Sequence, residues 1–191
     1  MTGLDPQKWL IDRAEEKLKQ AKLKGSAHFV LMEHPSTLTQ FPDASFDLVI
    51  SKEAILHVPL EVKKAFFQEI QRVLKPGGEI VIMDWMRTRE TYSPNTQKMM
   101  EMDGVAYHLV TPKEYVSLLE DAGFSNITME NVAEITAGYS QENILKIRSL
   151  EDAITEEYGH DVYNYCLESW GYQRDAFASG ELVSTILRAK I

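Results

Sequence analysis

The sequence predicts one α/β domain built on a parallel sheet that helices cover. Three observations support this fold class. The chain has 191 residues, of which 44% are apolar, and this is enough for one substantial core. Helix-like and strand-like patterns alternate along it. The two clearest strand candidates, Phe46–Ile50 and Glu79–Met83, are short apolar runs, as is typical of strands buried on both faces.

Helical spacing of apolar side chains defines the first two helices. Gln7–Lys24 has such a pattern, and Leu60–Leu74 places Phe66 and Ile70 on one face. Between these helices, His28–Met32 is a short strand candidate that precedes Phe46–Ile50.

Turn and capping residues delimit the later elements. Lys75-Pro76-Gly77-Gly78 ends the second helix and turns the chain into the strand Glu79–Met83. Thr111-Pro112-Lys113-Glu114 is a capping-box pattern with Pro at the first helical position, and it begins a helix that ends near Ala122. Four further elements are expected: a strand over Ile127–Val132, helices over 140–157 and 161–178, and a last strand over Leu182–Ala189.

Composition excludes several classes of protein. Acidic residues outnumber basic ones by 29 to 20, which argues against binding to nucleic acid or to an anionic membrane surface. No apolar run is long enough to span a bilayer. With one cysteine, Cys166, the chain has no internal disulfide, and its five histidines show no metal-ligand spacing, so no metal site is expected. Because no secretory signal is present, the expected location is cytoplasmic.

Three runs lie where the expected strands begin or end, and ligands of parallel sheets bind at the carboxyl ends of the strands. They are Gly3-Leu4-Asp5, Phe41-Pro42-Asp43-Ala44-Ser45-Phe46-Asp47-Leu48-Val49 and Arg72-Val73-Leu74-Lys75-Pro76-Gly77-Gly78. This succession resembles the class I S-adenosylmethionine-dependent methyltransferases. Within that class, Ser51–His57 resembles a segment of the phosphoethanolamine N-methyltransferases, of the type 11 methyltransferase group.

The resemblance implies a Rossmann-like sheet, mostly parallel with an antiparallel last strand. It implies a single domain over residues 1–191, with a lid or substrate cap at about 86–112 and 133–180. It also implies S-adenosylmethionine as cofactor and a small-molecule methyl acceptor, for which an amine is favoured.

The chain departs from the family at its amino terminus. The family's first strand ends in a glycine loop, GxGxG, and no two of the ten glycines here fall in that pattern. The match begins at the end of the second strand, so the fold is expected to be truncated there. His28–Met32 is then expected to lack its neighbour, and Phe46–Ile50 to form an exposed edge. The chain is then a fragment, or its strands re-pair, or a second copy covers the edge in a homodimer.

Five residues correspond to cofactor-binding positions of the family. Asp5 matches the acidic residue that binds the ribose hydroxyls, although Asp5-Pro6 is equally a helix N-cap. Glu33 matches the adenine-binding acid or is an ordinary loop carboxylate, and His34 would neighbour the adenine. Ser51 and Lys52 would present backbone groups to the methionine end.

Four residues are candidates for the chemistry. Glu53 would orient an acceptor amine and take its proton, or is a carboxylate at a helix start. His57 lies four residues later, which on a helical turn gives an acid–base pair with Glu53, or is a helix-end residue. Trp85 and Tyr107 match substrate-binding positions, and the Trp85 ring would attract an alkylammonium or pack in the core. Val105 replaces a phosphate-binding arginine, which disfavours phosphoethanolamine itself.

The alternative function is a non-catalytic methyltransferase-like protein, which binds or dimerises through the exposed edge and has lost the cofactor's glycine loop. A nicotinamide dehydrogenase would need G-x-G-x-x-G after the first strand, and that motif is absent.

Overall fold

The computed structural model describes residues 1–21, 25–32, 34 and 38–191, and it contains two sheets. β1 (Thr2–Asp5) and β2 (His28–Leu31) pair in parallel. A second sheet has the order β3-β4-β6-β5. Its strands are β3 (Phe46–Lys52), β4 (Leu74–Arg87), β5 (Ser125–Asn131) and β6 (Leu182–Lys190). β3 runs parallel to β4, whereas β6 is antiparallel to both of its neighbours, so the α/β fold with an antiparallel last strand is confirmed.

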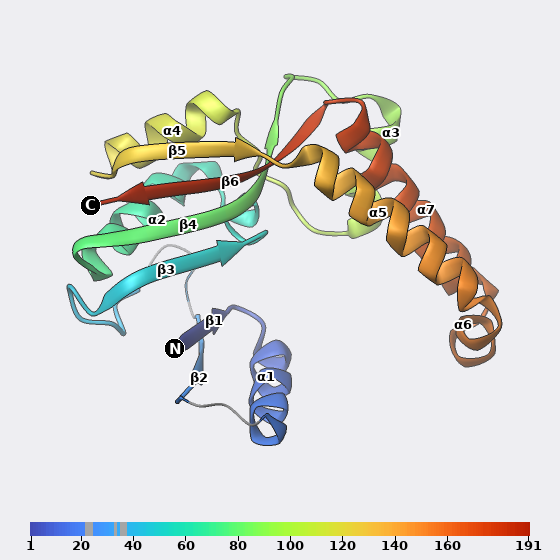
Figure 1. The fold of residues 1–191 in the computed structure, drawn as a ribbon, viewed down its shortest axis with the longest axis horizontal. Helices are drawn as coiled ribbons and strands as arrows, with labels where there is room; N and C mark the ends of the chain where they lie inside the picture. Colours follow the sequence, from blue (N-terminus) through green and yellow to red (C-terminus); the bar gives the residue numbers. More distant parts are fainter. Residues whose placement is uncertain (22–24, 33, 35–37) are drawn as a thin grey trace.

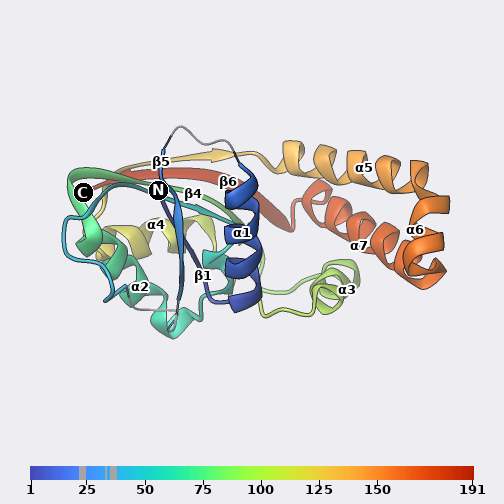
Figure 2. The same cartoon turned by 90° about the horizontal axis from the view of Figure 1, so that it is seen from below.

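Most of the helices form two groups around the four-stranded sheet (Figure 1). α2 (Leu60–Val73) and α4 (Pro112–Asp121) cover one of its faces, and Figure 2 shows both on the same side. The helical arm consists of α5 (Ala133–Ser149), α6 (Glu151–Tyr158) and α7 (His160–Ala178). The remaining helices are α1 (Lys8–Gln20), the short 3-10 helix η1 (Ile55–His57) and α3 (Pro94–Asp103). The arm and α3 lie at the end of the sheet where β3 and β4 finish (Figure 1).

The main core lies between α2 and the sheet. Phe67, Ile70 and Val73 of α2 are buried, as are Ile80 and Ile82 of β4. Each side chain of this size contributes about 1.5–3 kcal/mol when fully buried. A second cluster joins the end of the sheet to the arm, and it includes Leu56, Trp85, Met99, Phe177 and Leu182. The two clusters together fix the end of the sheet relative to the arm.

β3 forms one edge of its sheet, because it pairs with β4 alone among the described strands. Leu48 and Ile50 on this strand are 47% and 70% exposed. The expectation of an exposed apolar edge is therefore confirmed. The expectation that His28–Met32 lacks a neighbour is wrong, since β2 pairs along its whole length with the four residues of β1.

Two further expectations need correction. β4 extends beyond Met83 to Arg87, because β6 continues to pair with it as far as Arg87 opposite Leu182. Asp84 and Trp85 therefore lie inside a strand and not after one. The helix expected over 140–157 is two helices, α5 and α6, that meet at Leu150, where the backbone leaves the helical conformation (φ −112°, ψ 16°).

A buried carboxylate ties α3 to the sheet. Glu181, which precedes β6, is only 4% exposed. Its Oε2 accepts hydrogen bonds from the Ser93 amide (3.1 Å), the Ser93 hydroxyl (2.9 Å) and the Thr96 hydroxyl (2.6 Å) at the start of α3. The hydrogen bond from Thr96, followed by those from Ser93, holds the pKa of Glu181 below its ordinary value.

We predict that Glu181→Gln lowers the free energy of unfolding at pH 7 by about 1–3 kcal/mol, because buried donors at the start of α3 lose a charged acceptor. Since the folded pKa is depressed, this contribution is present above pH 4.5 and disappears as the pH falls through the folded value. Urea unfolding at pH 7 and at pH 4 measures both effects, with exposed Glu120→Gln as control. Equal stability of the variant and the wild type at pH 7 would contradict the prediction.

Candidate active site

The candidate site lies where β3 stops and β4 continues. Lys52, the last residue of β3, pairs with Met83. The Glu53 amide then donates to the Met83 carbonyl (2.7 Å), and Glu53 has a left-handed backbone conformation with φ +50°. A non-glycine residue in this region is held there by its surroundings and marks a place where a functional role is worth testing. Ser51 and Lys52 are the last two residues of β3, and Ser51 is half-buried whereas Lys52 is exposed.

His57 closes η1 and faces the segment that follows α3. Its Nδ1 lies 2.8 Å from the Ala106 carbonyl, and the His108 amide donates to the Leu56 carbonyl (2.8 Å). Because a carbonyl only accepts, Nδ1 carries the proton in this contact, and the neutral ring then has its lone pair on Nε2. A base is therefore available at Nε2.

The structure does not place Glu53 and His57 on one helical turn, because η1 begins at Ile55 and Glu53 precedes it. The two side chains form no hydrogen bond with each other in the described part of the chain. The prediction that Glu53 and His57 share one face of a helical turn is therefore wrong. Both residues nevertheless follow the end of β3.

The Tyr107 ring lies between those of His57 and Trp85 in a chain of ring contacts. The Tyr107 ring centroid lies 5.1 Å from that of His57 and 5.8 Å from that of Trp85, with which it is stacked at 11°. Phe177 of α7 meets the Trp85 ring edge-on at 5.2 Å. Trp85 is 7% exposed, and among the described residues its buried indole Nε1 has no hydrogen-bond partner. Trp85 is thus a core residue that backs Tyr107, and its N–H is an unused donor.

Carboxylates surround this aromatic pair. The Tyr107 hydroxyl donates to Asp103 (2.5 Å), and burial, with that carboxylate and the charge of Glu53, raises the pKa of Tyr107. Asp84, fully buried, accepts from the Tyr115 hydroxyl (3.0 Å) through Oδ2, while its Oδ1 has no partner in the described structure. Burial raises the pKa of Asp84 despite the Tyr115 hydrogen bond. The charge of Glu53 acts on both Tyr107 and Asp84, so Glu53 belongs to the same cluster.

Of the residues assigned to the cofactor's nucleoside, only Asp5 lies on the smaller sheet in the described structure. Asp5 ends β1, and its Oδ1 accepts from the Gln7 amide (2.7 Å). Gln7 itself is the N-cap of α1, so the N-cap alternative for Asp5 is wrong. Asp5 lines an apolar hollow of about 280 Å³ between β1, Phe29 and α1. His34 is exposed and follows β2, and Glu33 lies outside the described residues.

These residues fit an adenosyl group in part. Asp5 has a second carboxylate oxygen beyond the one that Gln7 occupies, and β1 and β2 end side by side, as the family's ribose and adenine positions do. The sequence holds no counterpart of the family's glycine loop for the methionine end. The structure places His57 beside Tyr107 and Tyr107 on Trp85, and the charge of Glu53 acts on Tyr107. Asp5 lies apart from them at the end of β1 in the small sheet, and His34 comes after β2.

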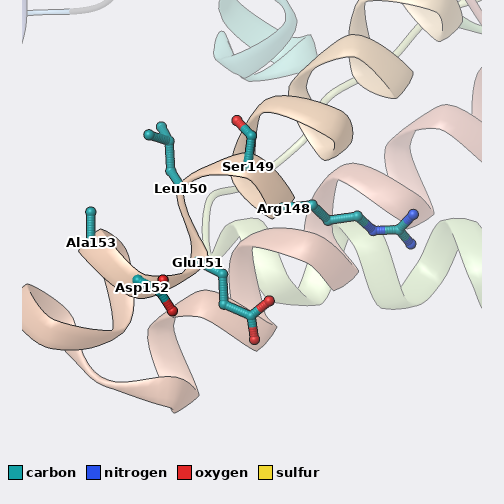
Figure 3. Close-up of a pocket in the computed structure, with 6 residues that line it drawn as sticks. All are labelled: Arg148, Ser149, Leu150, Glu151, Asp152 and Ala153. Carbon is teal, nitrogen blue, oxygen red and sulfur yellow. The ribbon is translucent and has the colours of Figure 1, made fainter.

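Other features do not add to the site. A hollow of about 350 Å³ lies at the α5–α6 junction, lined by residues 148–153, and Figure 3 shows Arg148 and Glu151 on its wall. It lies on the helical arm, away from the ends of β3 and β4. Within the described residues, no cluster of three metal-ligating side chains occurs, and no helix has the length and apolar character needed to cross a membrane.

Sequence reasoning missed two partners of the site. Asp103 lies four residues before Tyr107, on the last turn of α3, and only the fold brings its carboxylate to the hydroxyl. Lys63 is 1% exposed on the inner face of α2, next to the face that Phe66 and Ile70 mark as buried. That position on an apolar face was a usable signal, because lysine is almost never fully buried unless it is paired.

Comparison with known proteins shows which family the chain resembles. Residues 1–82 match a family described as a methyltransferase domain. The chain is 26% identical over 145 residues to phosphoethanolamine N-methyltransferase 1 of Arabidopsis thaliana, covering 76% of this chain and 29% of that protein. It is 30% identical over 139 residues to sterol 24-C-methyltransferase erg-4 of Neurospora crassa, covering 70% and 36% respectively.

The fold has solved counterparts. The structure of Haemonchus contortus phosphoethanolamine N-methyltransferase 2, in complex with phosphomonomethylethanolamine and S-adenosylhomocysteine, matches with a TM-score of 0.85 at 19% identity. The match covers 100% of this chain and 43% of that one. The resemblance to class I S-adenosylmethionine-dependent methyltransferases is confirmed, and the chain has their fold. It spans about 29% of the length of the Arabidopsis relative.

We predict that nitrogen-15 NMR of His57 shows the proton on Nδ1 and the lone pair on Nε2 when the ring is neutral, because the Ala106 carbonyl accepts from Nδ1. Exposed His160 on α7, measured in the same spectrum, serves as the reference for mixed tautomers. A His57 ring with its proton on Nε2 would contradict the geometry of the site.

Proposed function

We propose that this protein transfers a methyl group from S-adenosylmethionine to a small-molecule acceptor, preferably an unphosphorylated amine. The observation that carries the proposal is the position of His57, with Nε2 available as a base beside Tyr107 and Glu53 at the end of β3. The homology to methyltransferases supports the reaction class over a non-catalytic role.

The bound cofactor would supply an electrophilic methyl group. Asp5 would hold its ribose hydroxyls, and Glu33 and His34 would lie at its adenine. Ser51 and Lys52 would present backbone groups to its methionine end. These assignments come from the family resemblance, and the positions of Asp5 at the end of β1 and of Ser51 and Lys52 at the end of β3 support them.

Glu53 and His57 would act on the acceptor. An amine must be neutral to attack a methyl carbon, so a group at the site has to remove its proton. In this proposal, Glu53 orients the amine and favours a cationic acceptor on arrival, and His57 Nε2 takes the proton. Alignment and exclusion of water would supply much of the rate acceleration.

Tyr107 would contact the acceptor, and Trp85 would support it from behind, since Trp85 is nearly covered by Tyr107 and Phe177. The exposed side of the Tyr107–Trp85 stack would attract an alkylammonium by a cation–π interaction. Val105, 51% exposed, stands where the related enzymes have a phosphate-binding arginine, so the proposed acceptor carries no phosphate. Residues 86–112 and 133–180 would form the cap over it, within one domain that spans 1–191.

Methyl transfer to a panel of small amines, phenols and acids tests the reaction. We predict transfer to an amine, and a fall of about 10²- to 10⁴-fold in kcat for Glu53→Gln and for His57→Asn with unchanged cofactor affinity, since the first removes the charge that orients the amine and the second removes the proton acceptor. Glu61→Gln, an exposed carboxylate on α2, is the matched control. If a protein that binds S-adenosylhomocysteine transfers methyl to none of these acceptors, the proposal fails and the non-catalytic alternative is favoured.

The β3 edge is our proposed surface for self-association, because Leu48 and Ile50 present an unpaired apolar strand. We predict a dimer by size-exclusion with light scattering, and a monomer for Ile50→Lys, whose charge opposes edge pairing. Ile135→Lys on α5 is the matched control, as Ile135 is also 70% exposed. A wild-type protein that is monomeric at high concentration would contradict this proposal.

A further inference from the structure

Lys63 is a buried cation that the proposed reaction does not use. It lies on the inner face of α2, and it is 1% exposed. Its Nζ donates to the Ile55 carbonyl (2.7 Å) and to the His108 carbonyl (3.1 Å). A buried ammonium is costly unless it is hydrogen-bonded, so these two carbonyls are structural partners of the charge.

The two carbonyls belong to the segments that carry the candidate catalytic and acceptor-binding groups. Ile55 begins η1, which ends at His57, and His108 directly follows Tyr107. The same segments are joined by the hydrogen bond from the His108 amide to the Leu56 carbonyl and by the contact between His57 Nδ1 and the Ala106 carbonyl. Lys63 therefore adds a third bridge, at the buried end of this junction.

The charge of Lys63 also has an acidic neighbour. Burial lowers the pKa of Lys63, and the electrostatic attraction of Asp84 opposes that shift. Asp84 accepts a hydrogen bond from Tyr115 of α4, and it immediately precedes Trp85, on which Tyr107 stacks. Lys63 could thus act by neutralising Asp84, by holding the two carbonyls, or by both, and these roles are separable by substitution.

We propose that Lys63 is a positioning residue: by holding the Ile55 and His108 carbonyls it fixes His57 relative to Tyr107. The proposal rests on the proposed methyl transfer for its catalytic consequence, but its structural part, the order of the His57 ring, stands apart from activity. A displaced base costs rate even when every reacting group is present, since a misplacement of about 1 Å can lower a rate about 100-fold.

The experiment compares Lys63→Met with the double variant Lys63→Met/Asp84→Asn, which removes the pair of charges together. Lys64→Met is the control, because Lys64 is the exposed neighbour on the same helix. Three quantities are measured: the tautomer and the exchange rate of the His57 Nδ1 proton by NMR, the affinity for S-adenosylhomocysteine, and kcat with the amine acceptor. Thermal unfolding shows whether each variant is folded.

We expect the double variant to unfold cooperatively with wild-type cofactor affinity. Its His57 Nδ1 proton should exchange about tenfold faster or more, since the contact opens more often. Its kcat should be about 10- to 100-fold lower, and Lys64→Met should match the wild type. If the double variant instead has wild-type His57 exchange and kcat, Lys63 serves only to neutralise Asp84 and the proposal is overturned.

Two further outcomes remain decisive. If the wild type transfers no methyl group, the proposed function fails, while the His57 exchange rate still decides whether Lys63 orders that ring. If the variants do not fold, the wild-type ammonium signal is measured directly. A slowly exchanging Lys63 signal coupled through hydrogen bonds to the Ile55 and His108 carbonyls supports the proposal, and a rapidly exchanging one overturns it.

Discussion

The unequal length of β3 and β4 is the constraint on which the site depends. Their parallel pairing ends at Lys52 opposite Met83, but β6 carries β4 on to Arg87. Asp84 and Trp85 are therefore held rigidly by an antiparallel partner, while the space on their other side is left free by β3. Glu53 and η1 turn into that space, and the segment after α3 closes it from the other side through Ala106 and His108.

Acidic side chains gather where β3 ends beside the longer β4. The charge of Glu53 acts on both Tyr107 and Asp84, and the charge of Asp103 acts on Tyr107. Lys63 is the one buried cation among the described residues, and its ammonium donates to two backbone carbonyls. In the proposed reaction, an acceptor amine that arrives as a cation would meet the carboxylates of Glu53 and Asp103.

The sequence was informative where short runs determine local structure. The apolar runs predicted β3 and the centre of β4, and the helical spacing of Phe66 and Ile70 predicted α2. The Lys-Pro-Gly-Gly run, predicted to turn the chain before the second strand, lies inside β4, where Gly77 has the positive φ that glycine adopts readily. Reading the residues after these strands then indicated Glu53 and His57. The residues Trp85 and Tyr107 came from the family resemblance, and the structure places Tyr107 next to His57 and Trp85 next to Tyr107.

Contacts between distant parts of the chain were not predictable in this way. β1 has four residues, too few for a period, so its pairing with β2 was missed. The length of β4 depends on β6, about a hundred residues away, and so the places of Asp84 and Trp85 were misjudged. Lys63 bonds the His108 carbonyl across 45 residues of sequence, and no local pattern encodes that contact.

The most direct test of the account is calorimetric titration of the purified 191-residue chain with S-adenosylhomocysteine. The account predicts binding with a dissociation constant of about micromolar order, and roughly tenfold weaker binding for Asp5→Asn, because the loss of one charged hydrogen-bond partner is worth about 1.4 kcal/mol or more. A cooperatively folded chain that releases or absorbs no heat at millimolar ligand would contradict it.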